Sequence, residues 1–157
     1  MQTVTLYTDG GARGNPGPSG AGAVVVDNTS AYRMDPAVPL VIPEINAGDI
    51  QKNKGVIANP NCSAAIMLTA IAPLYQKNKI RRIVCSTYQS ASGAGRRAME
   101  ELEAQTRAHL DKKSIQKEVF PHQIAFNLFS HNSPVAEDGL NEEERKVIEE
   151  SRKILHD

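Results

Sequence analysis

The chain has 157 residues, a formal net charge of zero and 23% charged residues, which favours one globular domain and argues against a nucleic-acid-binding or membrane-surface protein. Its two cysteines lack CxxC spacing, and no apolar run is long enough to cross a membrane, which argues against a disulfide framework, a zinc site and a transmembrane helix. Because no signal-peptide pattern is present, the sequence predicts a cytoplasmic protein.

The first residues predict a β-hairpin. Val4–Thr8 and Gly22–Asp27 are β-rich runs, and Asp9–Gly20 between them is a loop of glycines and prolines. A dinucleotide-binding turn would need a helix directly after the glycines, and Pro16 and Pro18 would break that helix. We therefore predict a hairpin with a wide loop.

The stretch around Cys62 predicts a strand followed by a helix. Gly55–Ala58 is a short buried strand, Asn61 is a good helix N-cap, and Asn61–Tyr75 is an apolar run of helical length. Cys62 then lies in the first helical turn, where backbone N–H groups and the helix dipole favour a thiolate nucleophile. A small core residue is the other interpretation. The apolar face of this helix is expected at Ile66, Leu68, Ile71 and Leu74.

The second half of the chain continues with alternating elements. The pattern predicts a strand over Ile80–Tyr88 with Cys85 in the core, a helix over Gly93–Leu110, a strand over Ile124–Phe129 and a helix over Asn141–Leu155. The fold class is therefore α/β, a mixed sheet with flanking helices. In the helix over 93–110, Met99 and Leu102 are expected to face inward, and Arg96, Glu100 and Glu103 outward.

The segment Thr8–Pro18, TDGGARGNPGP, resembles the first hairpin of bacterial type I ribonuclease H. This resemblance implies that Asp9 is one of several carboxylates that hold two Mg²⁺ ions for phosphodiester hydrolysis. The other carboxylates have no clear counterparts, because Asp35, Glu44 and Asp49 lie among prolines and turns.

From about residue 23 to residue 157, a series of blocks resembles aspartate-semialdehyde dehydrogenase. These blocks include GVIANPNCSAAIML, RRIVCSTYQSASGAGRRAMEEL, FPHQIAFN and EEERKVIEESRKILHD, in the order of the family. The resemblance implies a partial fold similar to glyceraldehyde-3-phosphate dehydrogenase, preceded by the ribonuclease-H-like hairpin. The chain is thus expected to be a chimera of residues 1–22 and 23–157.

The dehydrogenase resemblance implies a reversible, phosphorylating oxidation of aspartate-β-semialdehyde that uses NADP and leads to lysine, threonine and methionine. Small-molecule substrate, phosphate and a homodimer partner are implied; nucleic acid is not. By resemblance Cys62 is the nucleophile that forms a thioester, and Gln89 orients the substrate. Ser92 and Gly93, at the start of the next helix, approach the cofactor.

Four further residues are implied to bind substrate or phosphate. Arg33 and Asn61 match the phosphate-binding positions, and an Arg fork suits that anion. Glu143 and Lys146 match the pair that contacts substrate, although an ordinary ion pair on a helix surface is nearly as good an interpretation.

Three functional hypotheses remain open at this point. The first is a dehydrogenase with impaired turnover, because the family's glycine-rich NADP turn and catalytic His have no counterpart. The second is a metal-dependent nuclease that uses Asp9. The third is a non-catalytic interaction domain.

Overall fold

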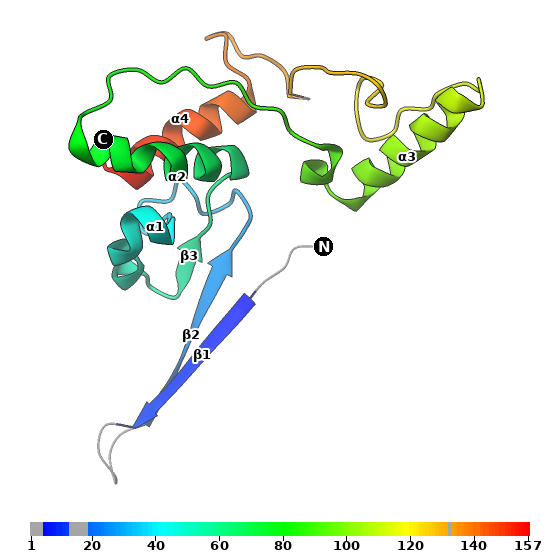
Figure 1. The fold of residues 1–157 in the computed structure, drawn as a ribbon. Coiled ribbons are helices and arrows are strands. Elements are labelled where there is room, and N and C mark those ends of the chain that lie inside the picture. Colours follow the sequence, from blue (N-terminus) through cyan, green and yellow to red (C-terminus); the bar gives the residue numbers. More distant parts are fainter. Residues whose placement is uncertain (1–4, 13–18, 132) are drawn as a thin grey trace. The chain divides into compact units, whose positions relative to one another are not determined.

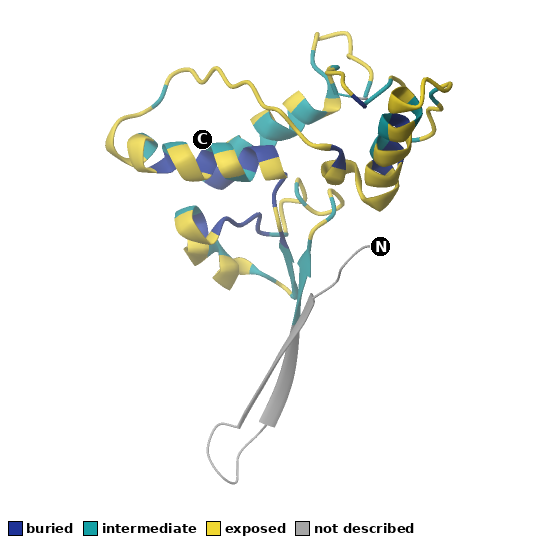
Figure 2. Ribbon diagram, turned by 45° about the vertical axis from the view of Figure 1, so that its right-hand side comes forward, coloured by how far each residue is buried: buried dark blue, intermediate teal, exposed yellow. Residues whose placement is uncertain are grey.

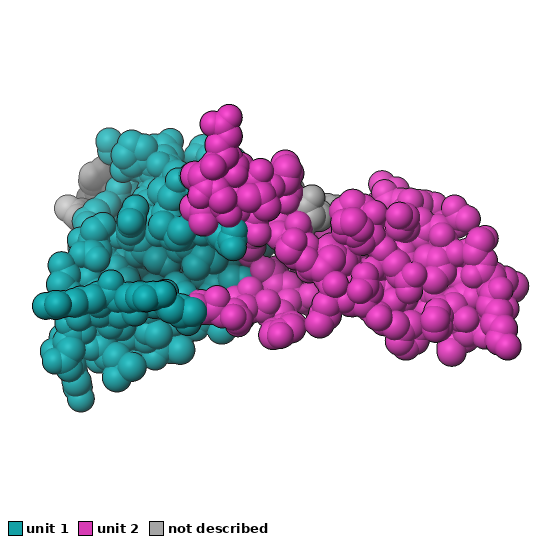
Figure 3. All heavy atoms as spheres, turned by 90° about the horizontal axis from the view of Figure 1, so that it is seen from above, with its two compact units in different colours: residues 1–84, 144–157 teal, residues 85–143 magenta. Residues whose placement is uncertain are grey.

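The computed structural model describes residues 5–12, 19–131 and 133–157 (Figure 1). They belong to two compact units, which Figure 3 distinguishes by colour: residues 1–84 with 144–157 form unit 1, and residues 85–143 form unit 2. The predicted division at residue 22 concerns sequence resemblance and stays a prediction. Among the described residues, no helix combines the length and apolar character that a membrane span requires.

Unit 1 contains a mixed sheet of the strands β1 (Thr5–Ala12), β2 (Ser19–Asp27) and β3 (Val56–Ala58) (Figure 1). β1 pairs with β2 antiparallel, and β2 pairs with β3 parallel. These pairings confirm the predicted hairpin, the short third strand and the mixed sheet. The connection from β2 to β3 carries the short helices α1 (Pro43–Asn46) and η1 (Ala47–Lys52).

The hairpin strands are longer than the sequence predicts. Gly10 pairs with Ala21 and Ala12 pairs with Ser19, so the wide loop expected over residues 9–20 is wrong at both of its ends. Ladder hydrogen bonds join backbone groups and need no side chains, so small residues can extend the pairing. The remainder of that loop, residues 13–18, lies outside the described residues.

Two long helices complete unit 1, α2 (Cys62–Lys77) and the part of α4 (Glu142–Leu155) that follows residue 143. Both were predicted. Figure 2 shows that the buried residues of unit 1 gather on these helices, on the segment before α1 and at the end of β3. The core consists of Leu40, Ile42, Ala58, Leu68 and Ile154.

The inward face of α2 differs from the predicted one. Ile66 is 74% exposed and Leu74 is 63% exposed, whereas the buried positions Ala64, Leu68 and Ala72 follow one another at intervals of four. Residues four apart share a helix face, and alanines allow close packing at the ends of that stripe. The expected face was right only for Leu68 and, in part, for Ile71, which packs against the core.

The strand predicted over residues 80–88 is wrong. The whole stretch is irregular and mostly exposed; Val84 is 80% exposed, and Cys85 is exposed rather than in the core. A strand needs a neighbour to pair with its backbone, and the sheet of the described residues consists of β1, β2 and β3 alone.

Unit 2 is built on the 3-10 turn η2 (Ala91–Ala94) and helix α3 (Arg96–Leu110). The helix was predicted, with its outward charges in place, but Met99 is 47% exposed. The buried positions are instead Ala98, Glu101 and Gln105. The inward side of α3 is therefore largely polar.

The polar inward side explains why the strand predicted over residues 124–129 is wrong. Gln105 Oε1 accepts hydrogen bonds from the amides of Ile124 and Ala125 at 2.9 and 3.2 Å, and Phe126 adopts a left-handed φ of 56°. Because these backbone amides donate to a side chain of α3, the segment forms a turn against that helix and does not pair as a strand.

Candidate active site

Cys62 is the first residue of α2 and is exposed. The preceding residue, Asn61, caps the helix: its side-chain oxygen accepts from the amides of Ser63 at 2.8 Å and Ala64 at 3.3 Å. This confirms the predicted N-cap and the position of the thiol in the first turn. The positive end of the helix dipole at this point favours a negatively charged group bound near it.

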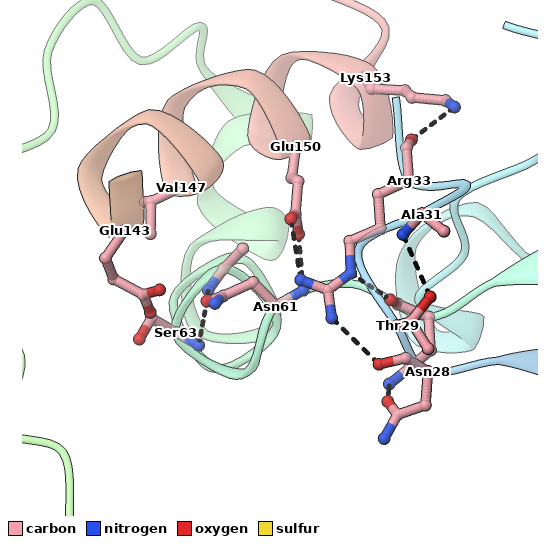
Figure 4. Close-up of polar contacts among 12 residues, drawn as sticks. Asn28, Thr29, Ala31, Arg33, Asn61, Ser63, Glu143, Val147, Glu150 and Lys153 are labelled. Atoms are coloured by element: carbon pink, nitrogen blue, oxygen red, sulfur yellow. Dashed lines mark hydrogen bonds and ion pairs between the residues drawn. The ribbon is translucent and has the colours of Figure 1, made fainter. Parts of the chain in front are cut away.

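Arg33 lies beside this helix start, held by three protein groups (Figure 4). Its Nε donates to the carbonyl of Asn59 at 2.9 Å, its Nη1 to Glu150 at 3.1 Å and its Nη2 to the carbonyl of Asn28 at 3.3 Å. The guanidinium is largely buried, with 11% of the side chain exposed. An arginine has five N–H donors, and the contacts with described residues use three of them.

Glu150 on α4 joins Arg33 to the start of helix α2. Its Oε1 pairs with Arg33, and its Oε2 accepts the backbone N–H of Asn61 at 2.6 Å (Figure 4). The residue is 1% exposed. A buried carboxylate must have partners to compensate for its lost hydration, and Glu150 has one charged and one neutral donor.

Glu150 was not among the predicted site residues, because a glutamate in a charged helix resembles a solvated side chain. One signal could have found it. Val147, Glu150 and Ile154 are spaced i, i+3 and i+7 and so share one helix face, and Ile154 is part of the core.

Lys153, one turn after Glu150, fixes the segment that carries Arg33. Its Nζ donates to the carbonyls of Arg33 and Asp35 at 2.7 Å each and of Val38 at 2.9 Å. Burial lowers the pKa of Lys153, and the charge of Asp35 partly opposes that change. α4 therefore anchors the Arg33 segment through both a carboxylate and an ammonium group.

In unit 2, the structure brings together two predicted site residues that are 54 positions apart. Gln89 Nε2 donates to Glu143 Oε1 at 2.7 Å. The Glu143 side chain is 13% exposed, and its other oxygen lies 3.9 Å from His131 Nε2. The Gln89 amide is thus held by a carboxylate.

Ser92 and Gly93 lie in η2, just before α3 rather than inside it. The Ser92 hydroxyl is 2.6 Å from that of Ser90, and the Gly93 amide donates to the Ser90 carbonyl at 3.1 Å. Among the described residues, a Cβ atom added at Gly93 would have one neighbour within 4 Å, the Gln89 side-chain oxygen at 3.9 Å. The open face of Gly93 lets a flat group approach the backbone next to Gln89.

The remaining predicted residues are placed as follows. Lys146 lies on α4 three residues after Glu143, so the two share a helix face. Asp9 lies in β1, and its side chain falls outside what the structure describes. Within the described part of the chain, no three His, Cys, Asp or Glu side chains come together as a metal site.

Two family models match this chain. The semialdehyde dehydrogenase dimerisation domain matches residues 71–157, and the semialdehyde dehydrogenase NAD binding domain matches residues 16–53. The first match covers more than half of the chain.

Individual relatives agree with the family models. The chain is 49% identical to the aspartate-semialdehyde dehydrogenase of Aquifex aeolicus over 98% of its own length and 47% of that protein. It is 56% identical to the enzyme of Synechocystis over 86% of its length and 40% of the relative. The chain therefore spans about half the length, or less, of these relatives.

Solved structures support the same assignment. The crystal structure of aspartate semialdehyde dehydrogenase II from Vibrio cholerae superposes with a TM-score of 0.82 at 43% identity, over 85% of this chain and 41% of that one. A probable aspartate-semialdehyde dehydrogenase from Pseudomonas aeruginosa gives a TM-score of 0.71 at 26% identity, over 84% of this chain and 40% of that one.

These similarities give no support to a ribonuclease-H-like segment at residues 1–22, to a chimeric chain or to a nuclease that uses Asp9. The Aquifex relative aligns over 98% of the chain, so the dehydrogenase similarity reaches into the N-terminal hairpin. From the matched domains, the relatives and the fold together, the chain belongs to the semialdehyde dehydrogenase family.

Proposed function

We propose that this chain carries the nucleophile region of an NADP-dependent aspartate-semialdehyde dehydrogenase, which oxidises aspartate-β-semialdehyde to aspartyl-β-phosphate reversibly. The observation that carries the proposal is the exposed Cys62 at the capped N-terminus of α2. A related structure, that of aspartate semialdehyde dehydrogenase II from Vibrio cholerae, is a complex with ASA, which supports the substrate.

Cys62 forms the covalent intermediate. Its thiolate attacks the aldehyde carbon, so that a carbon–sulfur bond forms and the carbonyl oxygen becomes an oxyanion. The positive end of α2 stabilises both the thiolate before attack and the oxyanion after it. Once the carbon has been oxidised to a thioester, an oxygen of phosphate attacks it, and the carbon–sulfur bond breaks to regenerate the thiolate.

Arg33 and Asn61 provide the phosphate contacts in this proposal. The guanidinium is already fixed by three protein acceptors, so its remaining donors are preorganised and lose little freedom when an anion binds. Asn61 lies directly before the nucleophile, and its side chain belongs to the helix cap.

Gln89, Glu143 and Lys146 are proposed to hold the substrate. The hydrogen bond from Gln89 to Glu143 fixes which way the amide points, and Gln89 is the residue that we assign to orient the substrate. Lys146 offers a cation to a substrate carboxylate.

Ser92 and Gly93 are proposed to contact one edge of NADP, which supplies the hydride acceptor when bound. The open face of Gly93 fits a flat ring, and the hydroxyl of the exposed Ser92 is a ready hydrogen-bond partner. The match to an NAD binding domain over residues 16–53 supports dinucleotide use.

A homodimer is the proposed assembly, supported by the match to a dimerisation domain over residues 71–157. Light scattering of the purified chain tests this directly: a mass of two chains supports the dimer, and a mass of one chain contradicts it.

Turnover tests the proposed function. The chain is mixed with aspartate-β-semialdehyde, NADP and phosphate, and NADPH absorbance is followed. We expect phosphate-dependent reduction that Cys62→Ser abolishes and Cys85→Ser leaves unchanged. Reduction that persists in Cys62→Ser would overturn the role of Cys62.

A further inference from the structure

Arg33 and Glu150 hold opposite ends of the turn that leads into α2. Arg33 binds the carbonyl of Asn59 at 2.9 Å, and Glu150 binds the amide of Asn61 at 2.6 Å. The two side chains also pair with each other at 3.1 Å. Together with the backbone from Asn59 to Asn61, these three contacts close a ring that includes the buried residue Pro60, and we call this ring the turn clamp.

A gain in stability does not by itself explain the turn clamp, because the burial of two charged side chains costs free energy. Glu150 is 1% exposed and the Arg33 side chain 11%, and well-packed apolar residues often stabilise a protein as much as a buried ion pair does. The ion pair instead fixes the orientation of the backbone, because each carboxylate oxygen of Glu150 accepts from a different donor. The backbone N–H so fixed belongs to the residue directly before Cys62.

We propose that Arg33 and Glu150 are positioning residues for Cys62, which fix the first turn of α2 and so set the reactivity of the thiol. The inference rests on the proposed function, in which Cys62 is the nucleophile. It gives Glu150 a role through Asn61 and gives Arg33 a second role besides phosphate binding.

The first test uses Arg33→Lys, which keeps the positive charge. An ammonium group lacks the planar fork that reaches Asn59 and Glu150 in fixed directions. Alkylation by iodoacetamide is followed at Cys62 and Cys85 separately by peptide mass spectrometry. We expect Cys62 to react about threefold more slowly, the size of a helix-terminus effect. Cys85, in unit 2, serves as the internal reference and keeps its rate.

The second test uses Glu150→Gln, for which charge and positioning predict opposite results. Loss of a negative charge near a thiol favours the thiolate and would make alkylation faster. A glutamine has one acceptor oxygen in place of two, so it opens the clamp, and positioning predicts slower alkylation. Glu149→Gln makes the same charge change one residue earlier, outside the clamp, and is expected to leave the Cys62 rate unchanged.

The outcomes separate cleanly. Slower Cys62 alkylation in both Arg33→Lys and Glu150→Gln, with hydrogen exchange along α2 as in the parent chain, supports the inference. An unchanged or faster rate in either variant overturns it. Loss of exchange protection along the whole of α2 also overturns it, because the pair would then hold the helix and not its first turn. The assay contains no substrate or cofactor, so absent turnover would count against the proposed function only.

Discussion

Two acidic residues, Glu150 and Asp49, behave differently from the solvated charges that surround them in the sequence. Glu150 is buried between Arg33 and the backbone. Asp49 accepts from Lys52 at 2.5 Å and from Asn46 at 2.9 Å, and lies 2.9 Å from His156. In both cases the carboxylate links segments that are distant in the chain, so each should contribute measurably to stability.

Replacing Glu150 by Ala should lower the free energy of unfolding by about 3–5 kcal/mol, because Arg33 would be left as a buried charge without its partner. The amide of Asn61 would lose its acceptor as well. Urea unfolding followed by circular dichroism measures the change. Glu149→Ala is the matched control, expected within about 0.5 kcal/mol of the parent. Equal losses in the two variants would contradict the burial argument.

The lowered pKa of Asp49 predicts that the free energy of unfolding depends on pH in the acidic range. Burial by itself would raise its pKa, but hydrogen bonds from Lys52 and Asn46 and the charges of His156 and Lys52 outweigh burial and lower the pKa below the ordinary 3.8. A carboxyl whose pKa is lower in the folded state stabilises the fold above that ordinary value, and this contribution is lost as pH falls through the folded pKa.

Asp49→Asn should therefore be less stable than the parent at neutral pH, and the difference should shrink in acid below the ordinary pKa of 3.8. The free energy of unfolding, measured for both proteins as pH is lowered, checks this. A difference that stays constant over that range would show that the charge of Asp49 contributes nothing.

At the level of elements, α2 combines a capped end that serves the site with a buried stripe that serves the core. Asn61 accepts two amide hydrogen bonds at the start, and Leu68 further along the helix is fully buried. These two features can be separated by substitution.

Asn61→Ala should cost about 0.5–2 kcal/mol of stability, the usual value of a lost N-cap. Asn61→Asp keeps an acceptor oxygen and should restore that stability, yet its negative charge next to Cys62 disfavours the thiolate and should slow alkylation of Cys62. Thermal unfolding and alkylation rates on the same samples separate the two effects. Equal stability of the Ala and Asp variants would argue against the cap.

Leu68→Ala should cost about 2–5 kcal/mol, because it leaves a cavity in the core. Ile66→Ala, on the same helix but at a site 74% exposed, should change stability by no more than about 0.5 kcal/mol. Urea unfolding of both variants checks the assignment of the inward face. The reverse order would contradict the placement of Leu68 in the core and of Ile66 at the surface.

Local signals predicted the elements that carry the site. The Asn-Pro-Asn break followed by an apolar run located the start of α2 and the position of Cys62, because capping and strand termination are local. The run at 80–88 has a clear β pattern, but strand formation depends on a neighbour that the pattern does not reveal. In the segment 124–129, two backbone amides donate to the side chain of Gln105, and no local pattern encodes this long-range contact.

The sequence predicted some residues of the candidate site and missed others. Arg33 and Gln89 came from motif resemblance, and the structure adds which groups hold them; Cys62 came from the local capping pattern as well as from the resemblance. Glu150 was missed because composition marks it as a surface residue, whereas its place on the face of Val147 and Ile154 marks it as buried. The partner of a buried charge is fixed by tertiary packing and so is invisible in the order of residues.

At the level of the whole molecule, the two units divide the proposed machinery. Unit 1 holds Cys62, the proposed nucleophile, with its cap and the Arg33–Glu150 pair, whereas unit 2 holds Gln89, Glu143 and the residues proposed for the cofactor edge. The chain spans 47% of its Aquifex relative, so activity of this chain by itself is the strictest test of the proposal.

The most direct measurement is the mass of the chain after incubation with aspartate-β-semialdehyde and NADP in the absence of phosphate. We predict an acyl group on Cys62, mapped by peptide mass spectrometry, that disappears when phosphate is added and never forms in Cys62→Ser. Failure of the adduct to form, or an equal adduct on Cys85, would contradict Cys62 as the nucleophile.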